Sequence, residues 1–157
     1  MSYAAPGRDR FESTRQTKYN VLMDSPSPPQ RPMQDLARRL LAAEATLPCA
    51  SQLPSHAAVR VCDTLRISLT RFAGADGFAS LLRRALVLAR AELPALQSIQ
   101  IGAEGGLEGF EQLATGTGAA AAAAITAHLL GLLVTFIGEP LTLTLVREAW
   151  PDTSLGE

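Results

Sequence analysis

Residues 55–94 read SHAAVRVCDTLRISLTRFAGADGFASLLRRALVLARAELP, and this stretch decides the fold. In its first half, apolar residues recur at spacings of four, three, four and three, namely Ala58, Cys62, Leu65, Leu69 and Phe72. This spacing is typical of a helix that packs lengthwise against another helix. Because Gly74 is a suitable C-terminal cap, we expect the first helix to end there.

The second half of the stretch predicts another helix. Asp76 is a typical N-terminal cap, and Pro94 ends the segment because proline cannot continue the backbone hydrogen bonds. Between these two residues, one apolar face contains Phe78, Leu81, Leu82, Ala85, Leu88 and Ala89. The connection around Gly74 is short, so we expect residues 55–93 to form an antiparallel helical hairpin.

A further helix and a proline-rich tail precede the hairpin. Spacings of three and four define one helical stripe before Pro48, made of Met33, Leu36, Leu40, Ala43 and Leu47. Residues 1–32 are polar and end in DSPSPPQRP, whose prolines favour an extended chain. They are interpreted as a flexible tail, with PxxP spacings that either dock on an aromatic groove or form a spacer.

The segment after the hairpin, residues 95–118, has no single periodicity. Leu96, Ile99 and Ile101 fit either an edge strand or a loop. Many glycines follow them and favour loops, with a short helix over residues 107–113.

The last segment fits two periodicities. Leucines at every second position from 141 to 145 alternate with threonines, as in a strand. The segment also aligns Leu141, Leu145 and Ala149 at helical spacing, and Pro140 suits a first helical turn. We therefore expect a helix that ends near Trp150.

Residues 119–137 form an uncharged run without a polar face. Such a run is either the central helix of a bundle or a membrane segment. Six consecutive alanines, which are barely apolar on insertion scales, and the absence of Lys or Arg close to either end favour the central helix. The sequence thus predicts an all-α bundle of four to five helices over residues 33–152, behind a flexible Pro-rich tail over residues 1–32.

The composition of the chain limits the classes of function that are expected for it. A net charge of −1 and an aromatic content of 5% argue against nucleic acid as a partner. Thirteen arginines against one lysine, in an alanine-rich chain, are typical of a GC-rich bacterial genome. The N-terminus has no apolar segment of the signal-peptide kind, so we expect a cytoplasmic location.

No residue pattern nominates a catalytic, cofactor-binding or metal-binding residue. Gly116, Gly118 and Ala121 match a dinucleotide fingerprint, but no strand-like segment precedes them, as that fingerprint requires. The histidines and cysteines lack zinc-finger spacing. His128 is therefore expected to be a hydrogen-bonded core histidine, and Cys62 a small buried hydrophobic residue.

His56 stands near the start of a helix in the predicted all-α bundle. This arrangement resembles histidine phosphotransfer proteins and the dimerisation domains of histidine kinases, and it makes His56 a speculative phosphoacceptor. The run His56-Ala57-Ala58-Val59-Arg60 lacks the acidic neighbour and the later proline of those families. The resemblance covers one helix, and the function is not carried over.

The charge pattern of the hairpin suggests an interface. It holds six arginines against three acidic residues, a net charge of +3, whereas residues 104–111 hold three glutamates. Complementary patches of this kind support docking or self-assembly. The candidate interface residues are Arg83, Arg84, Val87 and Arg90.

From these observations we expect a non-catalytic helical interaction or regulatory protein of a bacterium. Its partner is expected to be another protein or a second copy of itself. One alternative is a membrane-attached accessory protein anchored by residues 119–137. A further alternative is a phosphorelay or small-ligand-binding domain.

Overall fold

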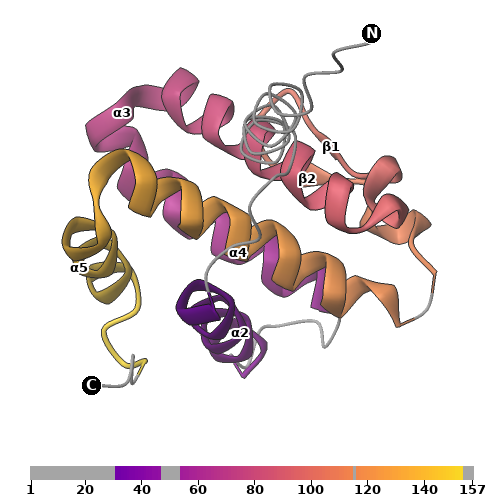
Figure 1. Ribbon diagram of the computed structural model, residues 1–157, viewed down its shortest axis with the longest axis horizontal. Coiled ribbons are helices and arrows are strands. Elements are labelled where there is room, and N and C mark those ends of the chain that lie inside the picture. Colours follow the sequence, from indigo (N-terminus) through magenta and orange to yellow (C-terminus); the bar gives the residue numbers. More distant parts are fainter. Residues whose placement is uncertain (1–30, 47–53, 115, 154–157) are drawn as a thin grey trace, which may run out of the picture.

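The computed structural model describes residues 31–46, 54–114 and 116–153. These residues form a helical bundle (Figure 1), and the predicted all-α class is confirmed. Its helices are α2 (Arg31–Ala45), α3 (Pro54–Glu92), α4 (Thr117–Ile137) and α5 (Glu139–Ala149). Between α3 and α4 lie two short 3₁₀ helices, η1 (Pro94–Ser98) and η2 (Phe110–Gln112), and the antiparallel strands β1 (Gln100–Ile101) and β2 (Leu107–Glu108).

Helix α3 contains the predicted hairpin. Gly74 interrupts it with φ 73° and ψ 169°, a backbone conformation that is almost restricted to glycine. The residues before Gly74 form a first arm and those after it a second arm. In Figure 1 the first arm passes behind α4, and the second arm returns in the opposite direction along its upper side.

Helix α4 is the central helix of the bundle, as predicted. It packs against α2, against α3 and against α5. Its buried residues are Ala121, Ala122, Ala124, Ile125, Thr126, Ala127, His128, Leu129, Leu130 and Leu133. The alanines among them have little volume, so neighbouring helix backbones can approach α4 closely.

One hydrophobic core joins all four helices. Leu40 of α2, Leu65 of α3, Leu129 of α4 and Leu145 of α5 belong to the same buried cluster. The predicted stripes contribute to this core, since Leu65 and its neighbour in the stripe, Leu69, are buried.

Two predictions need correction. Phe72 was assigned to the buried stripe of α3, but 67% of its surface is exposed, because it lies in the last turn before Gly74. The short helix predicted over residues 107–113 is instead strand β2 followed by η2. The strand alternative for residues 99–101 is realised as β1.

The C-terminal helix is confirmed by α5. Leu47 and nearly all of the tail lie outside the residues that the structure describes. The exceptions in the tail are Arg31 and Pro32, which begin α2.

Candidate functional site

A buried carboxylate joins three parts of the bundle. Glu44 of α2 is almost inaccessible to solvent, and its Oε2 lies 3.1 Å from Nε of Arg60 in α3. Its Oε1 accepts a 2.7 Å hydrogen bond from the Trp150 indole, just after α5. Both carboxylate oxygens are thus occupied by the fold, and neither is free to act as a general base.

A buried histidine makes a second polar contact. His128 of α4 is buried, and its Nε2 lies 2.8 Å from Oε2 of Glu92 at the end of α3. The expectation of a hydrogen-bonded core histidine is confirmed. Across residues 31–46, 54–114 and 116–153, no three His, Cys, Asp or Glu side chains are grouped so that they could hold a metal ion.

Cys62 is a core residue rather than a nucleophile. Burial, with a smaller contribution from Asp63, raises the pKa of its thiol from 9.0 to about 12. A thiol with so high a pKa carries almost no thiolate near neutral pH, and the thiolate is the reactive form. This agrees with the expectation of a small buried hydrophobic residue.

The structure gathers three of the four predicted interface residues on one surface. Arg83 and Arg84 of α3 are exposed, and 55% of the Val87 surface is exposed one turn later. We call these three residues the arginine face. Arg90 is half-buried and acts within the fold, because its guanidinium donates hydrogen bonds to the backbone oxygens of Leu96 and Ile99.

His56 borders a pocket of about 390 Å³ between the start of α3 and the segment from β2 to η2. We call it the acidic pocket, and it is lined by His56, Val59, Leu107, Glu108, Gly109, Phe110 and Glu111. The His56 side chain is exposed, as a phosphoacceptor has to be. The two carboxylates beside it repel a phosphate group, however, and the phosphoacceptor role stays a prediction.

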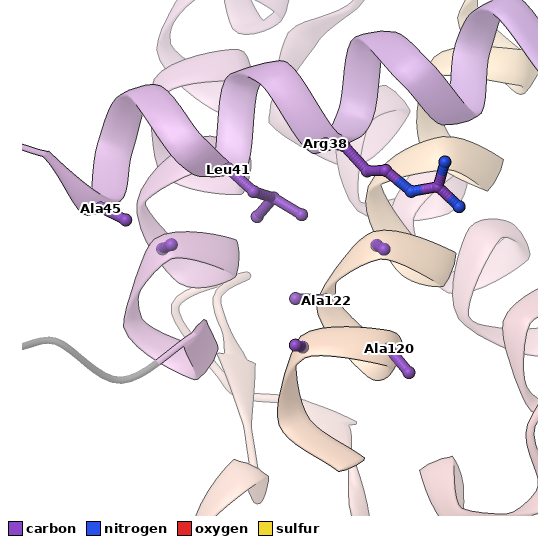
Figure 2. A pocket seen from close by; sticks show the side chains of 8 residues that line it. Arg38, Leu41, Ala45, Ala120 and Ala122 are labelled. Atoms are coloured by element: carbon purple, nitrogen blue, oxygen red, sulfur yellow. The ribbon is translucent and has the colours of Figure 1, made fainter. Parts of the chain in front are cut away.

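A second concavity, of about 430 Å³, lies between α2, the start of α3 and the start of α4. We call it the alanine groove, and it is lined by Arg38, Leu41, Ala45, Ala57, Ala119, Ala120, Ala122 and Ala123. Figure 2 shows Leu41 pointing from α2 into the space above α4, while Arg38 extends along the rim. Arg38 lies 3.4 Å from Asp35 and is the one charged residue among the described residues that line the groove.

Large apolar side chains are exposed near the kink of α3 and near the turn from α4 to α5. The exposed fractions are 67% for Phe72, 68% for Phe136 and 42% for Leu141. We call these three residues the apolar end. Figure 1 shows the kink of α3 and the turn from α4 to α5 at the same end of the molecule.

Sequence reasoning missed the apolar end. Phe72 continues the spacing of the buried Leu65 and Leu69, and Phe136 stands eleven residues after the buried Ile125, also on a core-facing stripe. A usable signal was nevertheless present. Each phenylalanine lies two residues before a glycine that interrupts or ends its helix, Gly74 inside α3 or Gly138 after α4.

Helix α4 also bears on the membrane alternative. Within the described part of the chain, it alone is long and apolar enough to cross a membrane, with a mean hydropathy of 2.1. Half of that apolar window is buried inside the bundle. Length and hydropathy alone therefore do not distinguish the two settings.

Comparison with known proteins gives no match. No family model, no curated protein and no solved structure is significantly similar to this chain.

Proposed function

We propose that this chain is a non-catalytic helical interaction protein that self-associates through its apolar end. The observation that carries this proposal is the exposure of Phe72, Phe136 and Leu141 at one end of the bundle. Exposed apolar groups that cluster on a small protein are typical of contact surfaces. Burying one phenylalanine contributes about 1.5–3 kcal/mol, so two copies of this end supply enough apolar surface for association.

The buried polar groups support a non-catalytic role. Glu44 is held by Arg60 and Trp150, and His128 is held by Glu92. General acid–base or nucleophilic catalysis needs such groups to be within reach of a substrate. In the described bundle these groups instead connect helices to one another.

A second copy is the occupant that we propose for the apolar end. Two helix termini present aromatic side chains there, and a two-fold contact places the same aromatic side chains of both copies against each other. Aromatic rings pair favourably beyond the apolar area that they bury.

The test is light scattering on size-exclusion fractions of the full-length chain. We expect a mass that is a multiple of 16.6 kDa for the wild type and a lower mass for the double variant Phe72→Ser/Phe136→Ser, which has lost the apolar contact. Ile67→Ser is the matched control, because Ile67 is also 67% exposed but lies between the buried Leu65 and Leu69, on the outer face of the same arm. A monomeric wild type, or a double variant that associates like the wild type, would contradict the proposal.

Membrane attachment through α4 is the second candidate, supported by the hydropathy of that helix. It requires the ten buried residues of α4 to leave the core that they share with α2 and α3. The two candidates differ in how the protein is extracted. Recovery without detergent favours self-association in the cytoplasm, and recovery only with detergent favours the membrane.

A further inference from the structure

We propose that the arginine face of one copy docks into the acidic pocket of a second copy. This inference rests on the proposed self-association and goes beyond it, because it names a second, polar contact between copies. The apolar end and this polar contact use different residues, so each copy has two separate surfaces for association.

The arginine face has the form of an apolar knob between two cations. Arg83 and Val87 are four residues apart and Arg84 and Val87 three, so all three side chains share one side of the second arm. Neither arginine forms an ion pair with any residue in the described part of the chain. Val87 is 55% exposed, so more than half of its surface is in contact with solvent.

The acidic pocket has the complementary form. Its apolar walls come from Val59, Leu107 and Phe110, and its carboxylates come from Glu108 and Glu111. Both glutamates are exposed, and neither forms an ion pair with another described residue. A volume of about 390 Å³ holds one valine side chain together with parts of the flanking arginines.

The arginine face and the acidic pocket are chemically complementary. A guanidinium pairs with a carboxylate through two parallel hydrogen bonds, which lysine cannot do. Docking therefore brings Arg83 and Arg84 to the rim carboxylates while Val87 meets the apolar walls. Complementary charges of this kind set partner choice and association rate more than the affinity itself.

A second copy carries both halves of this contact. Among the described residues of one copy, neither the two arginines nor the two glutamates form an ion pair. Each copy carries one arginine face and one acidic pocket, so the two surfaces are always present at the same concentration. An unrelated acidic protein is the alternative occupant of the arginine face, and the test below separates the two.

The test exchanges the charges. The variants are Arg83→Glu/Arg84→Glu and Glu108→Arg/Glu111→Arg, each followed by sedimentation velocity at low ionic strength. We expect each variant alone to self-associate at least about tenfold more weakly through this contact, and an equimolar mixture of the two to restore association. The control Arg38→Glu/Arg39→Glu makes the same charge change on two exposed arginines of α2, and we expect it to behave like the wild type.

Salt adds a second readout. Between about 0.01 M and about 1 M salt the screening length falls from about 30 Å to about 3 Å, so the polar contact should weaken in the wild type. The contact at the apolar end should persist, since salt does not screen apolar burial.

Each outcome decides something. The inference is overturned if either charge variant associates like the wild type, or if the mixture of the two stays unassociated, as it would if the arginine face served an unrelated acidic protein. Loss of association in Phe72→Ser/Phe136→Ser, with none in the charge variants, removes only the polar contact. A wild type that is monomeric at every salt concentration removes both proposals.

Discussion

Glu44 is a carboxylate inside a hydrophobic bundle, and its environment explains how it is tolerated there. An unpaired buried charge costs several kcal/mol, but Arg60 and Trp150 each satisfy one of its oxygens. Arg60 keeps part of its side chain in contact with water, which lowers the desolvation cost of the pair.

Replacing Trp150 by phenylalanine should isolate the hydrogen bond to Glu44. A smaller aromatic ring remains in the core, and Oε1 of Glu44 loses its donor inside the protein. We expect the free energy of unfolding to fall by about 1–3 kcal/mol, measured by urea denaturation followed by circular dichroism. Trp150 and Glu44 are the two partners of one hydrogen bond. The double variant Trp150→Phe/Glu44→Gln should therefore lose less free energy of unfolding than the two single variants added together.

The pKa of Cys62 predicts a loss of stability in alkali. The folded pKa of about 12 lies above the unfolded value of 9.0, so the stabilising contribution is complete below pH 9. It is lost as the pH rises from 9 towards 12, by about 1.4 kcal/mol per pH unit. In a Cys49→Ala background, the free energy of unfolding should therefore fall more steeply above pH 9 with Cys62 than with Cys62→Ala. Equal slopes would show that Cys62 is not buried as described.

At the scale of the elements, Gly74 decides where α3 turns. The backbone conformation, with φ of 73° and ψ of 169°, is the reason for glycine there. Lack of space is not, because a Cβ would meet no atom within 4 Å. The strain of a side chain in this conformation, rather than a clash, is what a substitution would introduce.

Gly74→Ala should lower the free energy of unfolding by about 1–3 kcal/mol. Gly118→Ala is the matched control, because its Cβ would also meet nothing within 4 Å but its backbone is helical. That change should raise the free energy of unfolding by about 0.5–1 kcal/mol. Thermal denaturation of the two variants would measure both, and a neutral Gly74→Ala would mean that the kink does not need a positive φ.

Periodicity predicted the elements better than their limits. Leu65 and Leu69 are buried as their spacing indicates, and α5 is a helix although alternating leucines also suggested a strand. Phe72 has the same spacing as those leucines and is exposed. A spacing pattern identifies which side of a helix faces the core, but it contains no information on where the neighbouring helices end.

At the scale of the whole molecule, the described helices form one cooperative unit. Their largest buried side chains belong to a single core, so no helix has a core of its own. Trp150 is the only tryptophan of the chain. Its indole lies against Glu44 of α2, so its fluorescence reports on the packing of the C-terminal segment against α2.

Unfolding by urea should therefore give the same midpoint by tryptophan fluorescence and by far-ultraviolet circular dichroism. The first observable follows the packing of Trp150, and the second follows helix content. A fluorescence transition at a lower urea concentration would show that the C-terminal segment separates before the other helices melt.

The candidate surfaces were predictable only in part. The sequence nominated Arg83, Arg84 and Val87, because a helical spacing places them together on a polar side. It did not reveal the acidic pocket, whose lining residues come from α3 and from the distant segment around β2. Contacts between residues far apart in the chain depend on the packing of elements, which spacing within one element does not contain.

The bond between Trp150 and Glu44 also has a consequence for the order of events during translation. Its partners are 106 residues apart, and Trp150 follows α5, the last of the described helices. A chain growing on the ribosome can assemble α2, α3 and α4 before this indole has left the exit tunnel. Until then Glu44 has Arg60 as its partner, and the hydrogen bond from Trp150 forms only after the other helices have emerged.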